Sequence, residues 1–272
     1  MKKIKYFILI FIISIYTVPG IAASRVDWIE GKIKSTGNSR IAIDESGSPV
    51  DIETGKTLSI SEARNIAYDR SKEIALVEAI KTISEIQVDN QKKIKDLIRE
   101  DLTVRQNISG VLEEYSRYKD SPADYISSAC ELEFNLGYLL TVLNYSFPGD
   151  SFPVRDDIEI STKYTSLIID VRGLGIKPML LPSILNESGL EIYNKNFIKS
   201  ADAVKYNPVS YVYNEKDAIK HKKSGQKPLF CAALKNMNGN PVIPDNVIKK
   251  MFSNKKNIEY LSKCRVIFII DR

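Results

Sequence analysis

The stretch "SISEARNIAYDRSKEIALVEAI", residues 59–80, predicts a long helix that lies close to another element. Ser59 stands three residues before Glu62, which is the spacing of a capping box, and the helix is expected to run to about Ile86. Small side chains recur every four residues along it, at Ala63, Ala67, Ser71, Ala75 and Ala79. Such a ridge lets a neighbouring backbone approach closely. Packing within one domain is the expected use of this ridge, and an oligomer interface is the alternative.

The segments on either side of this helix have the two-residue period of strands. Residues 130–136 alternate apolar and polar side chains, which predicts a half-buried strand. Residues 29–43 predict a hairpin that turns at Thr36-Gly37-Asn38, and an exposed loop follows over 44–57. A second helix is expected from Ile94 to Tyr115. The pattern therefore predicts an α+β domain in which helices cover one face of an open sheet.

A stretch rich in Phe, Pro and charged residues, 146–157, marks a domain boundary. Beyond it the pattern predicts strands at 167–171, 179–184, 190–193, 209–212, 229–234 and 265–270, and helices at 215–221 and 244–252. We expect one domain over residues 24–147 and a second over 158–272. The expected fold class is α+β, with two small open α/β sandwiches, mostly antiparallel sheets and helices on one face.

The first 23 residues are typical of an export signal peptide. Lysines at positions 2, 3 and 5 precede an uncharged apolar run over 6–18, and Pro19-Gly20 and small residues follow. The run is shorter than the ~20 residues that a bilayer-spanning helix needs. An uncleaved anchor is the alternative, and no cysteine lies near the cut to carry a lipid. We therefore expect an exported protein, periplasmic or associated with the outer membrane, that contacts a membrane only through this segment before cleavage.

Charge gives little support to a nucleic-acid partner. Loss of the leader removes three lysines, so the net charge falls from +5 to about +2. A nucleic-acid interface needs a concentrated basic face, and export makes that partner less favourable still.

The stretch "VRGLGIKPM", residues 171–179, resembles the start of a nucleotide-binding loop. A dinucleotide-binding motif would have its third glycine at position 178, which is a proline here, so the stretch does not fit a nucleotide-binding loop. The two glycines instead predict a bend in the chain, in which Gly173 and Gly175 adopt backbone angles that are disfavoured for other residues. Asp170 and Arg172 lie on one face of the strand that enters this bend. They are candidate ligands for a small anionic group or a peptide, and local charge satisfaction is the alternative.

The sequence offers no catalytic constellation. His221 is the only histidine, and no nucleophile elbow accompanies it. Three cysteines are too few and too widely spaced for a zinc site, so no metal or cofactor is expected. At most one disulfide is expected, with Cys231 and Cys264 as the candidate pair, and burial of all three cysteines as small apolar residues is the favoured alternative. We expect a protein that is not an enzyme.

Two sets of motifs carry a family resemblance. The stretches "SLIIDVRGLGIKPMLLPSILNESGLEIY", "KSGQKPLFCAAL" and "LSKCRVIFII" are similar to the C-terminal region often attached to domains of the twenty-kilodalton outer-membrane lipoprotein (Lpp-twenty) family. The helix "SEARNIAYDRSKEIALVEAI", after a strand containing Gly31, resembles the N-terminal signature of that family. The resemblance implies an envelope-associated α+β protein without known catalytic activity, and some relatives assemble into rings or discs around the flagellar motor. The lipidated cysteine of the family is missing here.

Two functional classes remain. One is a structural or assembly protein of the cell envelope, accessory to the flagellar motor by analogy, that self-associates or binds envelope proteins. The other is a periplasmic binding module that uses Asp170 and Arg172 for a small anionic ligand or a peptide.

Overall fold

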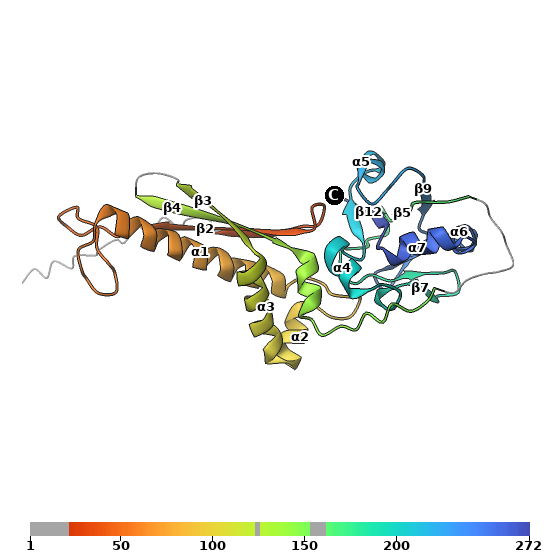
Figure 1. Cartoon of the computed structure of the whole chain (residues 1–272), viewed down its shortest axis with the longest axis horizontal. Helices are drawn as coiled ribbons and strands as arrows, with labels where there is room; N and C mark the ends of the chain where they lie inside the picture. The colour runs from red at the N-terminus through yellow and green to blue at the C-terminus, as the bar shows by residue number, and fades with distance from the viewer. Residues whose placement is uncertain (1–21, 123–125, 153–161) are drawn as a thin grey trace, which may run out of the picture.

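A computed structural model describes residues 22–122, 126–152 and 162–272. Residues 1–21 of the expected signal peptide, and residues 153–157 of the expected boundary, lie outside the described residues. Figure 1 shows two domains side by side along the long axis of the molecule.

The first domain is a single antiparallel sheet with helices on one face. Its elements are β1 (Ala23–Asp27), β2 (Lys32–Arg40), α1 (Ile60–Ser84), α2 (Ile94–Glu100), α3 (Leu102–Tyr115), β3 (Arg117–Pro122), β4 (Ser127–Asn135) and the 3-10 helix η1 (Leu136–Thr141). The strands are ordered β1-β2-β4-β3, and every neighbouring pair is antiparallel. The predicted half-buried strand is β4, whose Cys130, Leu132 and Phe134 face the core.

Helix α1 lies along one face of this sheet (Figure 1). The predicted capping box is confirmed, because the Ser59 side chain accepts from the Glu62 N–H and the Glu62 carboxylate accepts from the Ser59 N–H. The five small residues of the ridge are buried against the strands. A Cβ atom at Gly37 of β2 would lie 2.0 Å from the Ser71 carbonyl oxygen of the helix. The ridge therefore serves contact between α1 and the sheet.

The predicted hairpin turn at residues 36–38 is wrong. Strand β2 runs straight through these residues, and the turn between β1 and β2 lies at residues 28–31, where Gly31 has a φ of 67°. Gly37 is present because the backbone of α1 leaves no room for a side chain, and not because the chain reverses there.

The predicted second helix is two helices. Asp101 has extended backbone angles (φ −144°, ψ 108°) and separates α2 from α3. Its carboxylate accepts hydrogen bonds from the Thr103 N–H and hydroxyl, so Asp101 is the N-cap that starts α3.

The second domain contains two four-stranded sheets and several short helices. Its elements are β5 (Ser166–Asp170), β6 (Ile184–Leu185), β7 (Glu191–Tyr193), η2 (Lys195–Phe197), α4 (Ser200–Tyr206), β8 (Ser210–Val212), α5 (Glu215–Lys220), β9 (Pro228–Ala232), β10 (Lys235–Met237), β11 (Asn240–Val242), α6 (Asp245–Phe252), α7 (Lys255–Ser262) and β12 (Val266–Ile269). One sheet is ordered β8-β12-β5-β9 and the other β10-β11-β6-β7.

The α+β class is confirmed, and antiparallel pairing holds in the first domain and between β10 and β11 and between β6 and β7 of the second, but the remaining sheet is parallel and covered on both faces. All three pairings in the β8-β12-β5-β9 sheet are parallel. On one face Leu167 and Phe268 join the main core with residues of α6 and α7, and on the other Ile168 and Ile267 pack with Ala218 of α5. A parallel sheet buried on both faces has strands of consecutive apolar residues, which is the pattern of β5 and β12.

The candidate disulfide between Cys231 and Cys264 is wrong, because both thiols are free. Cys231 lies in β9, and β5 separates that strand from β12, which begins two residues after Cys264. Strands two positions apart are about 10 Å apart, whereas a disulfide needs Cα atoms within about 7 Å.

The two domains share one apolar core, which runs from Ile33 of β2 to Ile270 after β12. The Leu180 and Leu181 N–H groups donate to the carbonyls of Gln87 (3.0 Å) and Val88 (2.7 Å). A Cβ atom at Gly137 of η1 would lie 2.0 Å from a carbonyl oxygen of α4. A continuous apolar interface with such close backbone contacts holds two domains in one orientation.

Candidate functional site

The bend after β5 brings Asp170 and Arg172 together, as their shared face predicts. The Arg172 Nε donates to Asp170 Oδ1 at 2.8 Å, and its Nη2 lies 3.2 Å from the Glu215 carboxylate. The hydrogen bond from Arg172 lowers the pKa of the Asp170 carboxyl group. Asp271 accepts from the Gly173 N–H at 3.0 Å. Two carboxylates, those of Asp170 and Glu215, thus contact one guanidinium, and this surplus of negative charge disfavours an anionic ligand at the pair.

The two glycines of the bend have the backbone angles expected of them. Gly173 has a φ of 76° and Gly175 a φ of 65°, both in the left-handed region. Gly173 stays beside the carboxylates, whereas Gly175 lines a different feature, a cavity between the two domains.

This interdomain cleft has a volume of about 950 Å³. The first domain contributes the end of β1 and the turn after it, with the end of α1 and the segment that follows. The second domain contributes residues 175–179 and the turn between β10 and β11. Cavities of this size at domain interfaces are common ligand sites.

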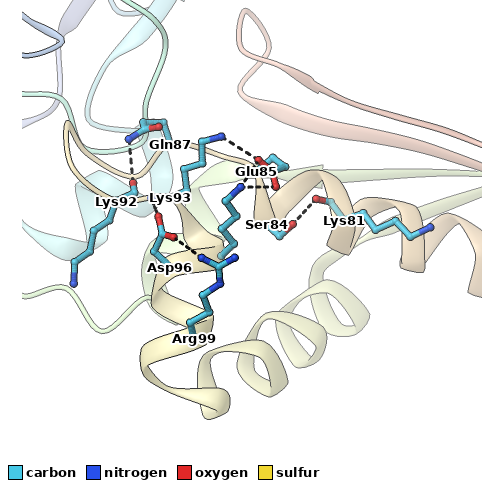
Figure 2. Close-up of polar contacts among 9 residues, drawn as sticks. Lys81, Ser84, Glu85, Gln87, Lys92, Lys93, Asp96 and Arg99 are labelled. Carbon is cyan, nitrogen blue, oxygen red and sulfur yellow. Dashed lines mark hydrogen bonds and ion pairs between the residues drawn. The ribbon is translucent and has the colours of Figure 1, made fainter.

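The segment after α1 forms the wall of the cleft from the first domain. The Gln87 side chain donates to the carbonyls of Asp89 (2.7 Å) and Lys92 (3.3 Å), which closes this segment into a compact loop. Figure 2 shows the contact between Gln87 and Lys92, and beside it Lys93 extending to Glu85 at the end of α1. The backbone pairing of Gln87 with Leu180 fixes this wall against the second domain.

The facing wall is the tip of the β10–β11 hairpin. Asn238 and Gly239 both have positive φ, 53° and 85°, as in a type I′ turn. A Cβ atom at Gly239 would lie 3.3 Å from the Met179 side chain and 3.9 Å from Asn90 of the other domain. This hairpin is absent from the predicted strands, although an Asn-Gly pair between two short strands is its strongest local signal.

Trp28, Tyr211 and Met179 form a connected apolar group beside the cleft. Trp28 and Met179 line the cavity, and the Trp28 ring meets the Tyr211 ring edge-on with centroids 5.5 Å apart. The buried Tyr211 hydroxyl donates to the Met179 carbonyl (2.8 Å) and accepts from its N–H (3.0 Å). Burial raises the pKa of Tyr211, so the hydroxyl stays protonated. These contacts fix the loop at Met179 and support the Trp28 ring.

The charged side chains of the cleft are mostly basic. Lys81, Lys93 and Lys177 line it, with Glu85 as the one acidic side chain of its lining. Glu85 accepts from Lys93 at 3.0 Å and from Lys95 at 3.0 Å, and the hydrogen bond from Lys93 is the largest cause of the lowered pKa of Glu85. Among residues 22–122, 126–152 and 162–272, Lys177 has no carboxylate partner.

The only histidine lies beside a second, smaller cavity of about 300 Å³ at the same interface. Burial lowers the pKa of His221 to about 4, and its Nδ1 accepts from the Lys223 N–H at 3.1 Å. The buried Lys223 Nζ donates to the Asn207 carbonyl at 2.8 Å, and burial lowers the pKa of this lysine to about 7. The Asn207 side chain in turn approaches Gly31 and Gly137 of the first domain. His221 and Lys223 thus support the domain interface.

Two further surveys are negative for the part of the chain that the structure describes. No group of three or more His, Cys, Asp and Glu side chains there could hold a metal ion. No helix in the same residues is both long and apolar enough to span a bilayer.

The fold and the cleft define a rigid two-domain α+β protein with a cavity between its domains. Residues 166–272 match the family described as Treponema pallidum Tp0624, second domain. The match covers less than half of the chain and falls within the second domain. The three C-terminal stretches that resemble the region attached to Lpp-twenty domains lie in the same part of the chain. No curated protein matches this chain.

Proposed function

We propose that the protein is an exported, non-enzymatic component of the cell envelope that acts by binding other molecules, with a structural or assembly role. The observation that carries this proposal is the apolar core shared by the two domains, because it presents their surfaces in one fixed arrangement. The leader-like first residues and the Lpp-twenty resemblance support the envelope location. A role accessory to the flagellar motor is the narrower form, by analogy with some relatives.

The proposal is tested on the protein in its native cells. We expect a C-terminally tagged chain in the envelope fraction, in a complex with further copies or with envelope proteins after mild cross-linking. Detection in the cytoplasm, or turnover of a substrate by the purified protein, would contradict the proposal. A deletion strain with normal motility would remove the flagellar form alone.

We propose a periplasmic binding module as the second candidate function, and the interdomain cleft favours it. The anion-binding role expected for Asp170 and Arg172 now has less support, because the carboxylates of Asp170 and Glu215 both contact that guanidinium. The cleft offers instead an open groove between the domains that has both apolar and basic walls. Under this candidate, Arg172→Ala leaves ligand binding unchanged, and substitutions in the cleft weaken it. If calorimetric titration shows that Arg172→Ala abolishes binding and the cleft variants retain it, the binding site is the bend after β5 and not the cleft.

A further inference from the structure

We propose that the interdomain cleft binds a small amphipathic organic anion, with an apolar body and one acidic group. This inference rests on the second candidate function and names the ligand class of its site. It depends on three properties of the cleft: its apolar side, its unpaired polar groups and its surplus of positive charge.

The apolar side suits a hydrocarbon or aromatic body. Trp28 and Ile86 line it from the first domain, and Pro178 and Met179 line it from the second. Met179 is held in place through its backbone by Tyr211, and Trp28 packs on the same tyrosine ring, so these groups are positioned before any ligand arrives. A preformed apolar surface binds apolar groups without a cost for ordering side chains.

The polar groups that remain unpaired stand on both walls. Asn90 comes from the first domain, and Lys177 and Asn238 come from the second. Within the described part of the chain, their side chains make no hydrogen bond to another residue. By contrast, the Asn236 side chain in the same lining is bonded to Leu174 and Gly239. An ammonium and two amide groups are donors that suit a carboxylate, sulfonate or phosphate group.

The charge of the lining selects an anion over a cation. Both oxygens of the Glu85 carboxylate already accept hydrogen bonds from Lys93 and Lys95, so they offer little to a cationic ligand. Lys81 is paired with Glu78 at 2.6 Å, which leaves Lys177 as the lysine of the cleft lining without a carboxylate partner in the described residues. The volume of about 950 Å³ is at the upper end of the range for small-molecule sites.

The test uses the single tryptophan of the chain, because Trp28 lies in this cleft. Intrinsic fluorescence of the purified protein is followed during titration with decanoate and, separately, with decyltrimethylammonium, below their micelle concentrations. The two probes have alkyl chains of nearly equal length and differ in the sign of the head-group charge. We expect a saturable fluorescence change with decanoate and a much weaker change with the cation.

Two variants locate the acidic group. Lys177→Gln is expected to weaken decanoate binding by about fivefold to tenfold, the effect of losing one charge-assisted contact. Lys216→Gln on α5 is the matched control, since this exposed lysine lies outside the cleft lining, and it is expected to leave the affinity unchanged. Circular dichroism spectra of both variants check that the fold is retained.

The outcomes separate this inference from the function on which it rests. If decyltrimethylammonium binds as well as decanoate, or if Lys177→Gln and Lys216→Gln behave alike, the anionic ligand class is overturned and the cleft stays a binding site. If neither probe changes the Trp28 fluorescence but an acidic peptide does, the small-molecule class is overturned in favour of a polypeptide. If none of the three binds, the binding-module function fails together with the inference.

Discussion

Substitution of Gly37 by alanine tests the contact on which the first domain depends. The new Cβ would lie 2.0 Å from the Ser71 carbonyl oxygen, 2.6 Å from the Ala75 nitrogen and 3.0 Å from the Ser71 carbonyl carbon. All three are backbone atoms of α1, so no side chain can rotate away to relieve the overlap. The helix must move by about 1.4 Å to restore ordinary van der Waals contact with the oxygen.

The size of the effect follows from that movement. A gap of this width between α1 and the sheet removes much of the dispersion attraction along the small-residue ridge. It also breaks the hydrogen bond from the buried Ser35 hydroxyl to the Ala75 carbonyl, which is 2.8 Å long in the wild-type protein. Overpacking of this kind costs typically 1–3 kcal/mol, and we expect a loss of about 3 kcal/mol in the free energy of unfolding. A loss of that size lowers the melting temperature by about 6 to 12 °C.

Thermal and urea denaturation, followed by circular dichroism, measure the difference. Gly110→Ala is the matched control, because Gly110 lies inside α3 and, in the described part of the chain, nothing beyond the adjacent helix backbone lies within 4 Å of the added Cβ. It should stabilise the protein by about 0.5–1 kcal/mol, since alanine favours helix over glycine. If Gly37→Ala were as stable as the wild type, the close packing of α1 on β2 would be refuted.

Three further predictions test other contacts. Burial lowers the pKa of Lys223 from its usual value of 10.5 to about 7, so between these pH values the unfolded chain binds more protons than the folded chain. The free energy of unfolding should therefore rise by about 2 kcal/mol from pH 7 to pH 9. Lys223→Met should flatten this rise, as measured by denaturant titrations at each pH. Dithiothreitol should leave the melting temperature unchanged, because all three cysteines are free, and a drop on reduction would reveal a disulfide. Gly137→Ala should push η1 away from α4 and loosen the contact between the domains. Hydrogen exchange should then accelerate at the Leu180 and Leu181 amides, which donate hydrogen bonds across the interface. Unchanged protection of these two amides would contradict the tight interface.

The elements with strong local signals could be predicted from sequence. Ser59 and Glu62 marked the start of α1, because a capping box is complete within four residues. The alternation from Cys130 to Phe134 identified a strand with one buried face. The consecutive apolar residues of β5 and β12 also indicate a parallel sheet covered on both faces, so this sheet could have been predicted in place of an antiparallel one.

The candidate site could not be predicted in the same way. Its walls come from four segments, residues 26–28, 81–93, 175–179 and 236–239, and no local pattern states that they meet. Asp170 and Arg172 are close in sequence, but the fold brings Glu215 of α5 to the Arg172 guanidinium. Which charges surround an arginine depends on chain segments far away in sequence.

The amino-acid sequence alone determined where most helices and strands form, because caps, apolar periods and the conformational freedom of glycine act within a few residues. Only the tertiary structure decided what those residues are for. Gly37 marks a close approach of helix and strand rather than a turn, the buried Lys223 ammonium donates to the Asn207 carbonyl, and Trp28 and Lys177 line one cleft. Each of these roles arises from contacts between distant segments, whose geometry is fixed when the two domains close around a common core.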